Sequence, residues 1–137
     1  MMQFVYNDGG RSKYFRGNCG DCAIRAIAIA NEMDYLEVYN MVNKTAGLSC
    51  RNGTPKKVSH KILANLGWEW VPTMLIGQGC KVHLNANELP KNATLIVSVS
   101  KHLTCVKNGV IYDIFDPSRG GNRCVYGYYI KKILKNF

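Results

Sequence analysis

The chain has 137 residues, of which 47% are hydrophobic and 20% charged, a composition typical of a globular protein rather than a disordered one. Its 18 Lys and Arg residues outnumber 9 Asp and Glu residues, and the resulting net charge of +9 favours acidic partners such as nucleic acid, an acidic protein or a phosphorylated substrate. The basic residues are dispersed and form no nucleic-acid-binding motif, so a protein or peptide partner is favoured over nucleic acid.

The sequence shows no segment that would direct the chain to a membrane. No stretch approaches the roughly 18 consecutive apolar residues of a membrane-spanning helix. The start, MMQFVYNDGG, lacks the basic and apolar regions of a secretory signal. We therefore expect a cytoplasmic protein without membrane association. In that compartment the six cysteines are expected to be thiols. Four of them are expected to be buried thiols: Cys50, Cys80, Cys105 and Cys124.

The first half of the chain predicts helices. The first runs from Cys22 to about Asn31 and is apolar on almost all sides, so it should be buried. The second begins after Asp34, which forms a capping box with Glu37, and continues to about residue 45 before Gly47 ends it.

A third helix is predicted after the stretch NGTP. Thr54 is expected to cap this helix, with Pro55 at its first helical position. The helix should end at Gly67, and the apolar residues on its buried face are Val58, Ile62, Leu63 and Leu66.

The second half of the chain predicts strands. WEWVP is a short alternating strand, and TLIVSVS is a richer one at residues 94–100. Residues 102–116 are typical of a hairpin around Asn108 and Gly109, and RCVYGYYIKKI supplies a last strand. No linker or repeat divides the chain. Helices followed by an antiparallel sheet predict an α+β fold in a single domain over residues 1–137.

The segment RGNCGDCAIRAIAIA places Cys19 and Cys22 in a C-x-x-C spacing, with Cys22 at the start of the first helix. Zinc usually takes four ligands from two close pairs, but the other cysteines are solitary and no H-x-x-x-H pair exists, so no metal or other cofactor is expected. A thioredoxin-like redox dithiol would need a βαβ context, which the predicted order of helices followed by strands does not provide. Backbone N–H groups and a partial positive charge at a helix N-terminus favour a thiolate, so Cys22 is the candidate nucleophile.

A nucleophilic cysteine needs a base, usually histidine, and a group that orients this base. The chain has three histidines. His60 is predicted on the third helix beside basic residues, and His83 in the loop CKVHLN. His102 begins a strand at the edge of the predicted sheet, and we favour it as the base.

The predicted hairpin offers a carboxylate to orient His102. If Asn108 and Gly109 form a two-residue turn, His102 faces Phe115 and lies diagonally across from Asp113 on the same face of the sheet. The diagonal separation of roughly 7–8 Å is within side-chain reach. Asp113 is therefore the first candidate for the orienting residue, as a carboxylate directed at the imidazole requires.

These residues resemble the papain-type cysteine peptidases. RGNCGDCA is similar to the nucleophile segment QGxCGSCW, with Cys22 in the place of the nucleophile, and the order Cys, His, then Asn or Asp on the next strand is also papain-like. Bacteriocin-processing papain-like peptidases carry their Asp in a D-P pair, which would favour Asp116 over Asp113. Papain-type enzymes have an oxyanion-hole Gln six residues before the nucleophile, where this chain has Arg16. The resemblance therefore implies that Arg16, Asn18 or backbone N–H groups would take that role.

A closer resemblance covers most of the chain. GDCAIRAIA, GTPKKV, LGWEWVPTM, GCKVHL, LIVSVSKHLTCVKNGVIYDIFDPSR and RCVYGYY resemble small papain-like cysteine peptidase homologues of bacteriophages and prophages. This resemblance implies a compact papain-like fold, N-terminal helices packed on a C-terminal antiparallel sheet, and a location in the host-cell cytoplasm.

The residues and the resemblance together predict a papain-like cysteine hydrolase that attacks an amide or isopeptide bond in a host or phage protein. Glutamine deamidation or transglutamination uses the same three groups and is an alternative. A second alternative is a catalytically weak papain-like scaffold that binds a host protein or a nucleic-acid complex through its basic surface. The sequence determines neither the substrate nor the oligomeric state.

Overall fold

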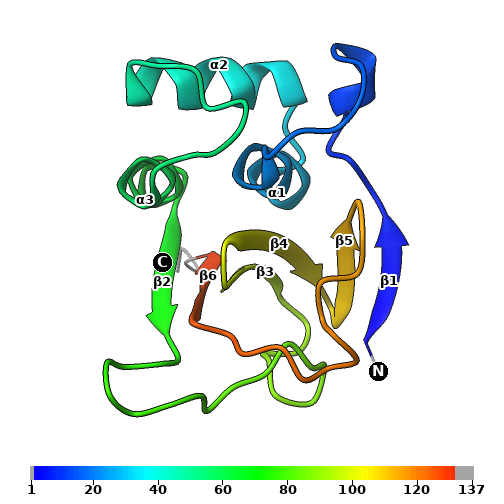
Figure 1. Cartoon of the computed structure of the whole chain (residues 1–137), viewed down its shortest axis with the longest axis vertical. Coiled ribbons are helices and arrows are strands. Elements are labelled where there is room, and N and C mark those ends of the chain that lie inside the picture. Colours follow the sequence, from blue (N-terminus) through cyan, green and yellow to red (C-terminus); the bar gives the residue numbers. More distant parts are fainter. Residues whose placement is uncertain (1, 132–137) are drawn as a thin grey trace, which may run out of the picture.

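The computed structural model describes residues 2–131, and its three helices lie on one side of a six-stranded sheet (Figure 1). Every neighbouring pair of strands is antiparallel except β1 and β5, which are parallel. The order across the sheet is β1 (Gln3–Tyr6), β5 (Val110–Asp113), β4 (His102–Lys107), β3 (Thr94–Val99), β6 (Gly127–Lys131) and β2 (Trp68–Pro72). The predicted α+β class is confirmed; the end of the predicted last strand, residues 132–133, lies outside the described residues.

Strand β1 is an element that the sequence did not indicate. All four of its residues are exposed, so the stretch QFVY shows no alternation of buried and exposed positions. It pairs with β5 from Gln3↔Val110 to Tyr6↔Asp113. The prediction of a sheet that is antiparallel throughout and built after the helices is therefore wrong at this edge.

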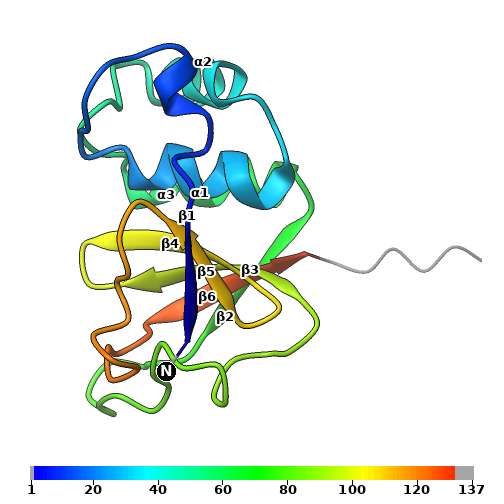
Figure 2. The same ribbon diagram turned by 90° about the vertical axis from the view of Figure 1, so that its right-hand side faces the viewer.

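The three helices form two layers over the sheet. Helix α2 (Tyr35–Ala46) is outermost, and α1 (Cys22–Asn31) and α3 (Lys56–Asn65) lie between it and the strands (Figures 1 and 2). The Asp34 side chain caps α2 by accepting the Glu37 backbone N–H at 3.4 Å, as predicted. No helix within residues 2–131 has the length and apolar character needed to span a bilayer.

Helix α3 begins one residue later than predicted. Pro55 has an extended backbone, with φ −56° and ψ 139°, and is the N-cap rather than the first helical residue. Thr54 therefore lies too early in the chain to cap α3, and its hydroxyl oxygen is buried without a hydrogen-bond partner. The capping prediction for Thr54 is wrong because Pro55, with its ψ of 139°, is extended rather than helical, so the first helical residue is Lys56.

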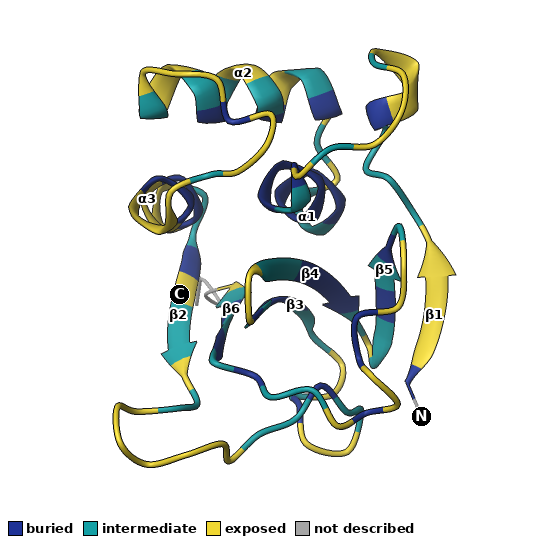
Figure 3. Ribbon diagram, in the orientation of Figure 1, coloured by how far each residue is buried: buried dark blue, intermediate teal, exposed yellow. Residues whose placement is uncertain are grey.

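Helix α1 is buried on nearly all sides (Figure 3) because it packs against both α2 and the sheet. Ile24 and Ile27 are fully buried in the core between the helices and the sheet. Strand β3 contributes Ile96 to this core and Leu95 and Val97 to a second core on the opposite face. The helix that carries Cys22 is thus held in place along its length.

The β4–β5 hairpin has the predicted register. Lys107 pairs with Val110, and the two turn residues Asn108 and Gly109 have φ values of 50° and 78°. Positive φ at both central positions is typical of a two-residue type I′ turn. This register fixes which side chains of β4 and β5 share a face.

Strand β6 lies between β3 and β2 and approaches Trp70 closely. A Cβ atom on Gly127 would lie 2.3 Å from the Trp70 ring, so only glycine allows this contact. The Trp70 ring packs on Tyr129 with 4.8 Å between ring centroids. Trp68, by contrast, is buried in the core. The two tryptophans of WEWVP therefore share one face of the sheet: Trp68 is in the core, and Trp70 packs at its edge and lines the cavity described below.

Two of the cysteines form a disulfide, contrary to the prediction that all six are thiols. Cys80 and Cys124 are bonded, with 5.8 Å between their Cα atoms. The reason is local pairing: the Val125 N–H donates to the Val82 carbonyl and the Leu84 N–H to the Arg123 carbonyl, each at 2.8 Å, and this antiparallel contact brings the two cysteines together. Neither cysteine is buried, whereas Cys50 and Cys105 are buried thiols as predicted.

We expect non-reducing, denaturing alkylation to modify four cysteines, because only Cys80 and Cys124 are bonded among the six. Reduction should lower the free energy of unfolding by about 2–4 kcal/mol, since the disulfide closes a loop across 44 residues. Urea titration with and without dithiothreitol measures this change. A variant with Cys80→Ala and Cys124→Ala should not respond to dithiothreitol, and modification of all six cysteines without reductant would contradict the assignment.

Candidate active site

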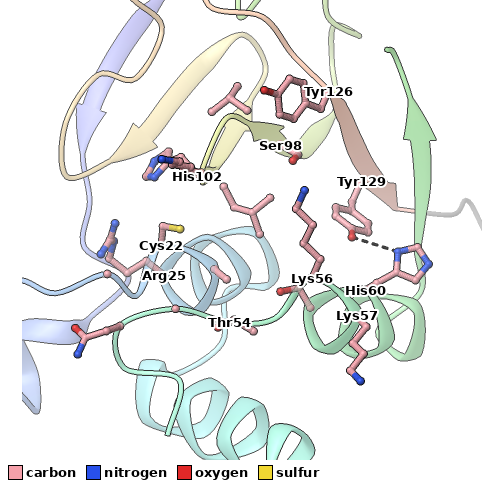
Figure 4. A pocket seen from close by; sticks show the side chains of 18 of the residues that line it. Cys22, Arg25, Thr54, Lys56, Lys57, His60, Ser98, His102, Tyr126 and Tyr129 are labelled. Atoms are coloured by element: carbon pink, nitrogen blue, oxygen red, sulfur yellow. Dashed lines mark hydrogen bonds between the residues drawn. The ribbon is translucent and has the colours of Figure 1, made fainter. Parts of the chain in front are cut away.

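Cys22 lies where helix α1 meets strand β4. It is the first residue of α1, and the Asp21 side chain does not cap the helix, so the free N–H groups of the helix end remain next to the thiol. The His102 ring and the backbone N–H of Leu103 are the neighbours of the Cys22 sulfur that lower the pKa of its thiol. Figure 4 shows the sulfur of Cys22 and the ring of His102 on neighbouring walls of the pocket.

His102 is the first residue of β4 and lies between Cys22 and Asp113. Its Nε2 atom is 2.7 Å from Oδ2 of Asp113, which leaves Nδ1 for the Cys22 sulfur. The ring packs on Phe115 with 5.0 Å between centroids, and only 9% of the side chain is exposed. The imidazole is therefore held in one orientation by contacts on both sides of the hairpin.

Asp113, the last residue of β5, is buried and fully engaged. Its Oδ2 atom accepts a hydrogen bond from the Thr104 hydroxyl at 2.6 Å, and its Oδ1 atom accepts one from the Ile114 N–H at 2.7 Å. Asp116, the alternative orienting residue, is exposed and accepts the Ser118 N–H at 2.9 Å in a turn. The structure thus places Asp113 beside His102, whereas the Asp116 side chain stabilises a turn.

A buried network of charged residues, which the sequence did not lead us to expect, lies next to the site and contacts Asp113. The Asp21 carboxylate is fully buried and contacts Arg25, Tyr35 and Arg11, the last at 3.2 Å. Arg25 also reaches Asp113, with 3.8 Å between its Nη2 atom and Oδ1. One signal could have revealed this network: Asp21 and Arg25 are charged residues at helical i,i+4 spacing in a segment that is otherwise apolar.

The environments of Cys22 and His102 favour their charged forms. Burial acts to raise the pKa of the Cys22 thiol, but the hydrogen bonds from His102 and Leu103 and the positive charges of His102 and Arg25 outweigh it and lower that pKa. Burial acts to lower the pKa of His102, but its bonds to Asp113 and Cys22 raise it to about 9. Near neutral pH these shifts favour a thiolate beside an imidazolium.

Cys105 shows what burial does without such partners. Its side chain is fully buried in β4, and burial raises the pKa of its thiol to about 12. A buried thiol of this kind is unreactive at neutral pH. The lowered pKa of Cys22 therefore comes from its specific partners and not from its location in the protein interior.

Cys22 and His102 lie on the wall of a cavity of about 890 Å³ that extends to Tyr129 and His60. Arg16 and Asn18, the expected oxyanion donors, are exposed and are not among the residues that line it. The structure therefore does not bring these two side chains to the thiol. Asn52 lines the cavity, and its backbone carbonyl would be 2.9 Å from a Cβ atom on Gly20, so the loop of Asn52 lies against the turn before α1.

The other two histidines lie away from the thiol. His60, on α3, is 3.2 Å from the Tyr129 hydroxyl, and His83 is 3.1 Å from Oε1 of Glu88. Within residues 2–131 no three His, Cys, Asp or Glu side chains are grouped so that they could hold a metal ion. No protein-family model, curated protein or solved structure matches the chain.

Proposed function

We propose that the protein is a papain-like cysteine hydrolase that attacks an amide or isopeptide bond in a protein or peptide. One observation carries this proposal: the His102 ring lies between the Cys22 thiol and the Asp113 carboxylate, on the wall of a cavity of about 890 Å³. A thiol at a helix N-terminus, a histidine in contact with it and a carboxylate behind the histidine are the groups that nucleophilic acyl transfer needs.

In the proposed reaction the Cys22 thiolate attacks the substrate carbonyl and forms a tetrahedral oxyanion. The Cys22 backbone N–H and the side-chain amide of Asn52 are our candidates for the oxyanion donors. His102 gives its proton to the leaving amine as the C–N bond breaks, which leaves a thioester on Cys22. Water then attacks the thioester while His102 takes up the water proton, and the C–S bond breaks to release the carboxylic acid and restore the Cys22 thiolate beside the imidazolium. Asp113 holds the ring orientation throughout.

The pKa shifts give the proposed reaction a defined pH range. Below the lowered pKa of Cys22 the thiol is protonated and cannot attack. Above the His102 pKa of about 9 the imidazole has no proton to give to the leaving group. Activity should therefore be bell-shaped, and its alkaline limb should lie near pH 9.

The experiment is alkylation with iodoacetamide from pH 5 to pH 9, with the modified cysteines identified by peptide mass mapping. We expect Cys22 to react fastest, with a half-maximal rate below pH 8.5, the usual pKa of a free thiol being about 8.5. Cys19, three residues earlier, is an internal control that lines the same cavity, and its sulfur donates to the Arg51 carbonyl at 2.9 Å. If Cys22 reacts no faster than Cys19, the proposed function fails.

Glutamine deamidation and transglutamination would use the same thiolate and imidazolium but release ammonia. A peptide mixture incubated with the wild-type protein and with Cys22→Ala separates these reactions by mass. Hydrolysis of a peptide bond yields two shorter peptides, whereas deamidation raises the mass of an intact peptide by about 1 Da because an amide becomes an acid. Neither change should occur with Cys22→Ala.

A further inference from the structure

The cavity beside Cys22 is lined by basic side chains and by no acidic ones. Five cationic residues contribute to its wall: Arg25, Lys56, Lys57, Lys61 and Lys101. No Asp or Glu is among its lining residues, and within residues 2–131 none of these four lysines takes part in an ion pair. Arg25 is paired with Asp21 and Asp113, but the positive charges of the four lysines are not neutralised by an ion pair in the described part of the chain.

Lys56 has the central position in this wall. It is the first residue of α3, and Figure 4 shows its side chain extending into the cavity, between the part that holds Cys22 and the part that holds Tyr129. Lys57, the next residue, points the opposite way in the same view. The ammonium of Lys56 carries three hydrogen-bond donors and a positive charge, which suit a carboxylate.

The rest of the cavity suits an extended peptide. Trp70 and Tyr129 pack on each other and form an aromatic wall beyond Lys56, and Leu103 adds an apolar surface next to His102. Aromatic surfaces accept apolar side chains and the edges of a peptide chain without demanding one residue type. The charge pattern therefore supplies the selectivity that the aromatic wall lacks.

We propose that the cavity selects peptide substrates that carry a Glu or Asp side chain near the attacked carbonyl, and that Lys56 binds this carboxylate. The proposal rests on the proposed function, because it places the acidic residue relative to the carbonyl that Cys22 attacks. Charge complementarity supports a polypeptide with an acidic side chain, since four lysines without ion pairs and no Asp or Glu line the cavity beside its aromatic wall.

The test uses tetrapeptide vinyl sulfones, which the Cys22 thiolate attacks at the vinyl carbon. Pools are fixed at one position in turn as Glu, Gln or Lys. We expect a Glu pool to label Cys22 about five- to tenfold faster than the matched Gln pool, and the Lys pool to be slowest. Lys56→Gln should remove the difference between Glu and Gln, and 0.5 M NaCl should reduce it.

Lys44→Gln is the matched control. It removes the same charge from an exposed site on α2, the outermost helix, and does not line the cavity. This variant should keep the preference for Glu. An equal loss of preference in Lys44→Gln and Lys56→Gln would show that only the overall charge matters and would overturn the assignment to Lys56.

Two further measurements separate the failure of this inference from the failure of the proposed function. If iodoacetamide modifies Cys22 selectively but the Glu and Gln pools label it equally, the inference fails and the proposed function stands. If Cys22 is unreactive, binding of fluorescein-labelled Glu and Gln peptides to Cys22→Ala, measured by anisotropy, tests the inference alone. Tighter binding of a single-stranded oligonucleotide than of the Glu peptide, lost in Lys56→Gln, would assign the cavity to nucleic acid instead.

Discussion

Replacing His102 with alanine is expected to lower the alkylation rate of Cys22 at pH 6 by about 10- to 100-fold. The variant removes the hydrogen bond and the positive charge that lower the pKa of the thiol, whereas the burial that raises this pKa remains. The thiolate fraction at pH 6 falls tenfold for each unit by which the pKa rises. A thiolate of higher pKa is intrinsically more nucleophilic, which offsets part of this loss.

Loss of His102 should reduce hydrolysis more than alkylation. Iodoacetamide releases iodide and needs no proton, but an amide leaving group does, so the variant also lacks the general acid, a loss of about 100- to 10,000-fold. Iodoacetamide rates and cleavage of a peptide found with the wild-type protein measure the two effects separately. Equal losses in both would contradict the role of His102 as proton donor.

Two pairs of variants control this prediction. His60→Ala removes a histidine from the far side of the same cavity and should leave the Cys22 alkylation rate within about twofold of wild type, since His60 contacts Tyr129.

Asp113→Asn removes the charge that helps to raise the pKa of His102, and the alkaline limb of the activity profile should move below pH 9. Asp116→Asn makes the same chemical change in an exposed turn and should not move that limb. A shift with Asp116→Asn alone would reverse the assignment of the orienting residue.

Replacing Asp21 with asparagine is expected to lower the free energy of unfolding by about 3–5 kcal/mol. Asp21 is fully buried and is the shared partner of two buried guanidinium groups, Arg11 and Arg25. Asparagine has nearly the same shape but no charge, so Arg11 would lose its carboxylate and Arg25 the nearer of its two, although both side chains are buried. Urea unfolding followed by circular dichroism measures the change.

Asp34→Asn is the matched control for this prediction. It makes the same change at an exposed residue, and asparagine caps a helix about as well as aspartate. We expect it to cost less than about 1 kcal/mol. If Asp21→Asn lowers the free energy of unfolding no more than Asp34→Asn does, the prediction is wrong, and the charge of Asp21 is not needed for stability.

Local sequence patterns were sufficient to predict elements whose bounds depend on their own residues, such as capped helices and a tight hairpin. The apolar periodicity and the capping residue fixed α1 and α2 almost to the residue, and Asn108-Gly109 set the register that puts Asp113 beside His102. The sequence did not determine whether Asp113 or Asp116 orients His102, because the hairpin register favours Asp113 and the D-P pair favours Asp116. The structure separates them by burial.

Long-range features were not predictable in the same way. Strand β1 has no alternation, and only its pairing with β5 makes it a strand. The bond between Cys80 and Cys124 depends on two loops that meet only in the folded chain. The sequence does not indicate the surroundings of Arg25 and Lys56: Arg25 is buried between two carboxylates, and the Lys56 side chain extends into the cavity. Their roles follow from neighbours that are distant in sequence.

The two halves of the candidate site lie in segments that are synthesised at different times. His102 and Asp113 are on one hairpin, whereas Cys22 is on a helix that is synthesised well before that hairpin. Until β4 docks on α1, the thiol has no imidazole beside it and keeps the low reactivity of an ordinary cysteine. A nascent chain on the ribosome would therefore carry a latent thiol, and its activation would coincide with the docking of the hairpin on α1.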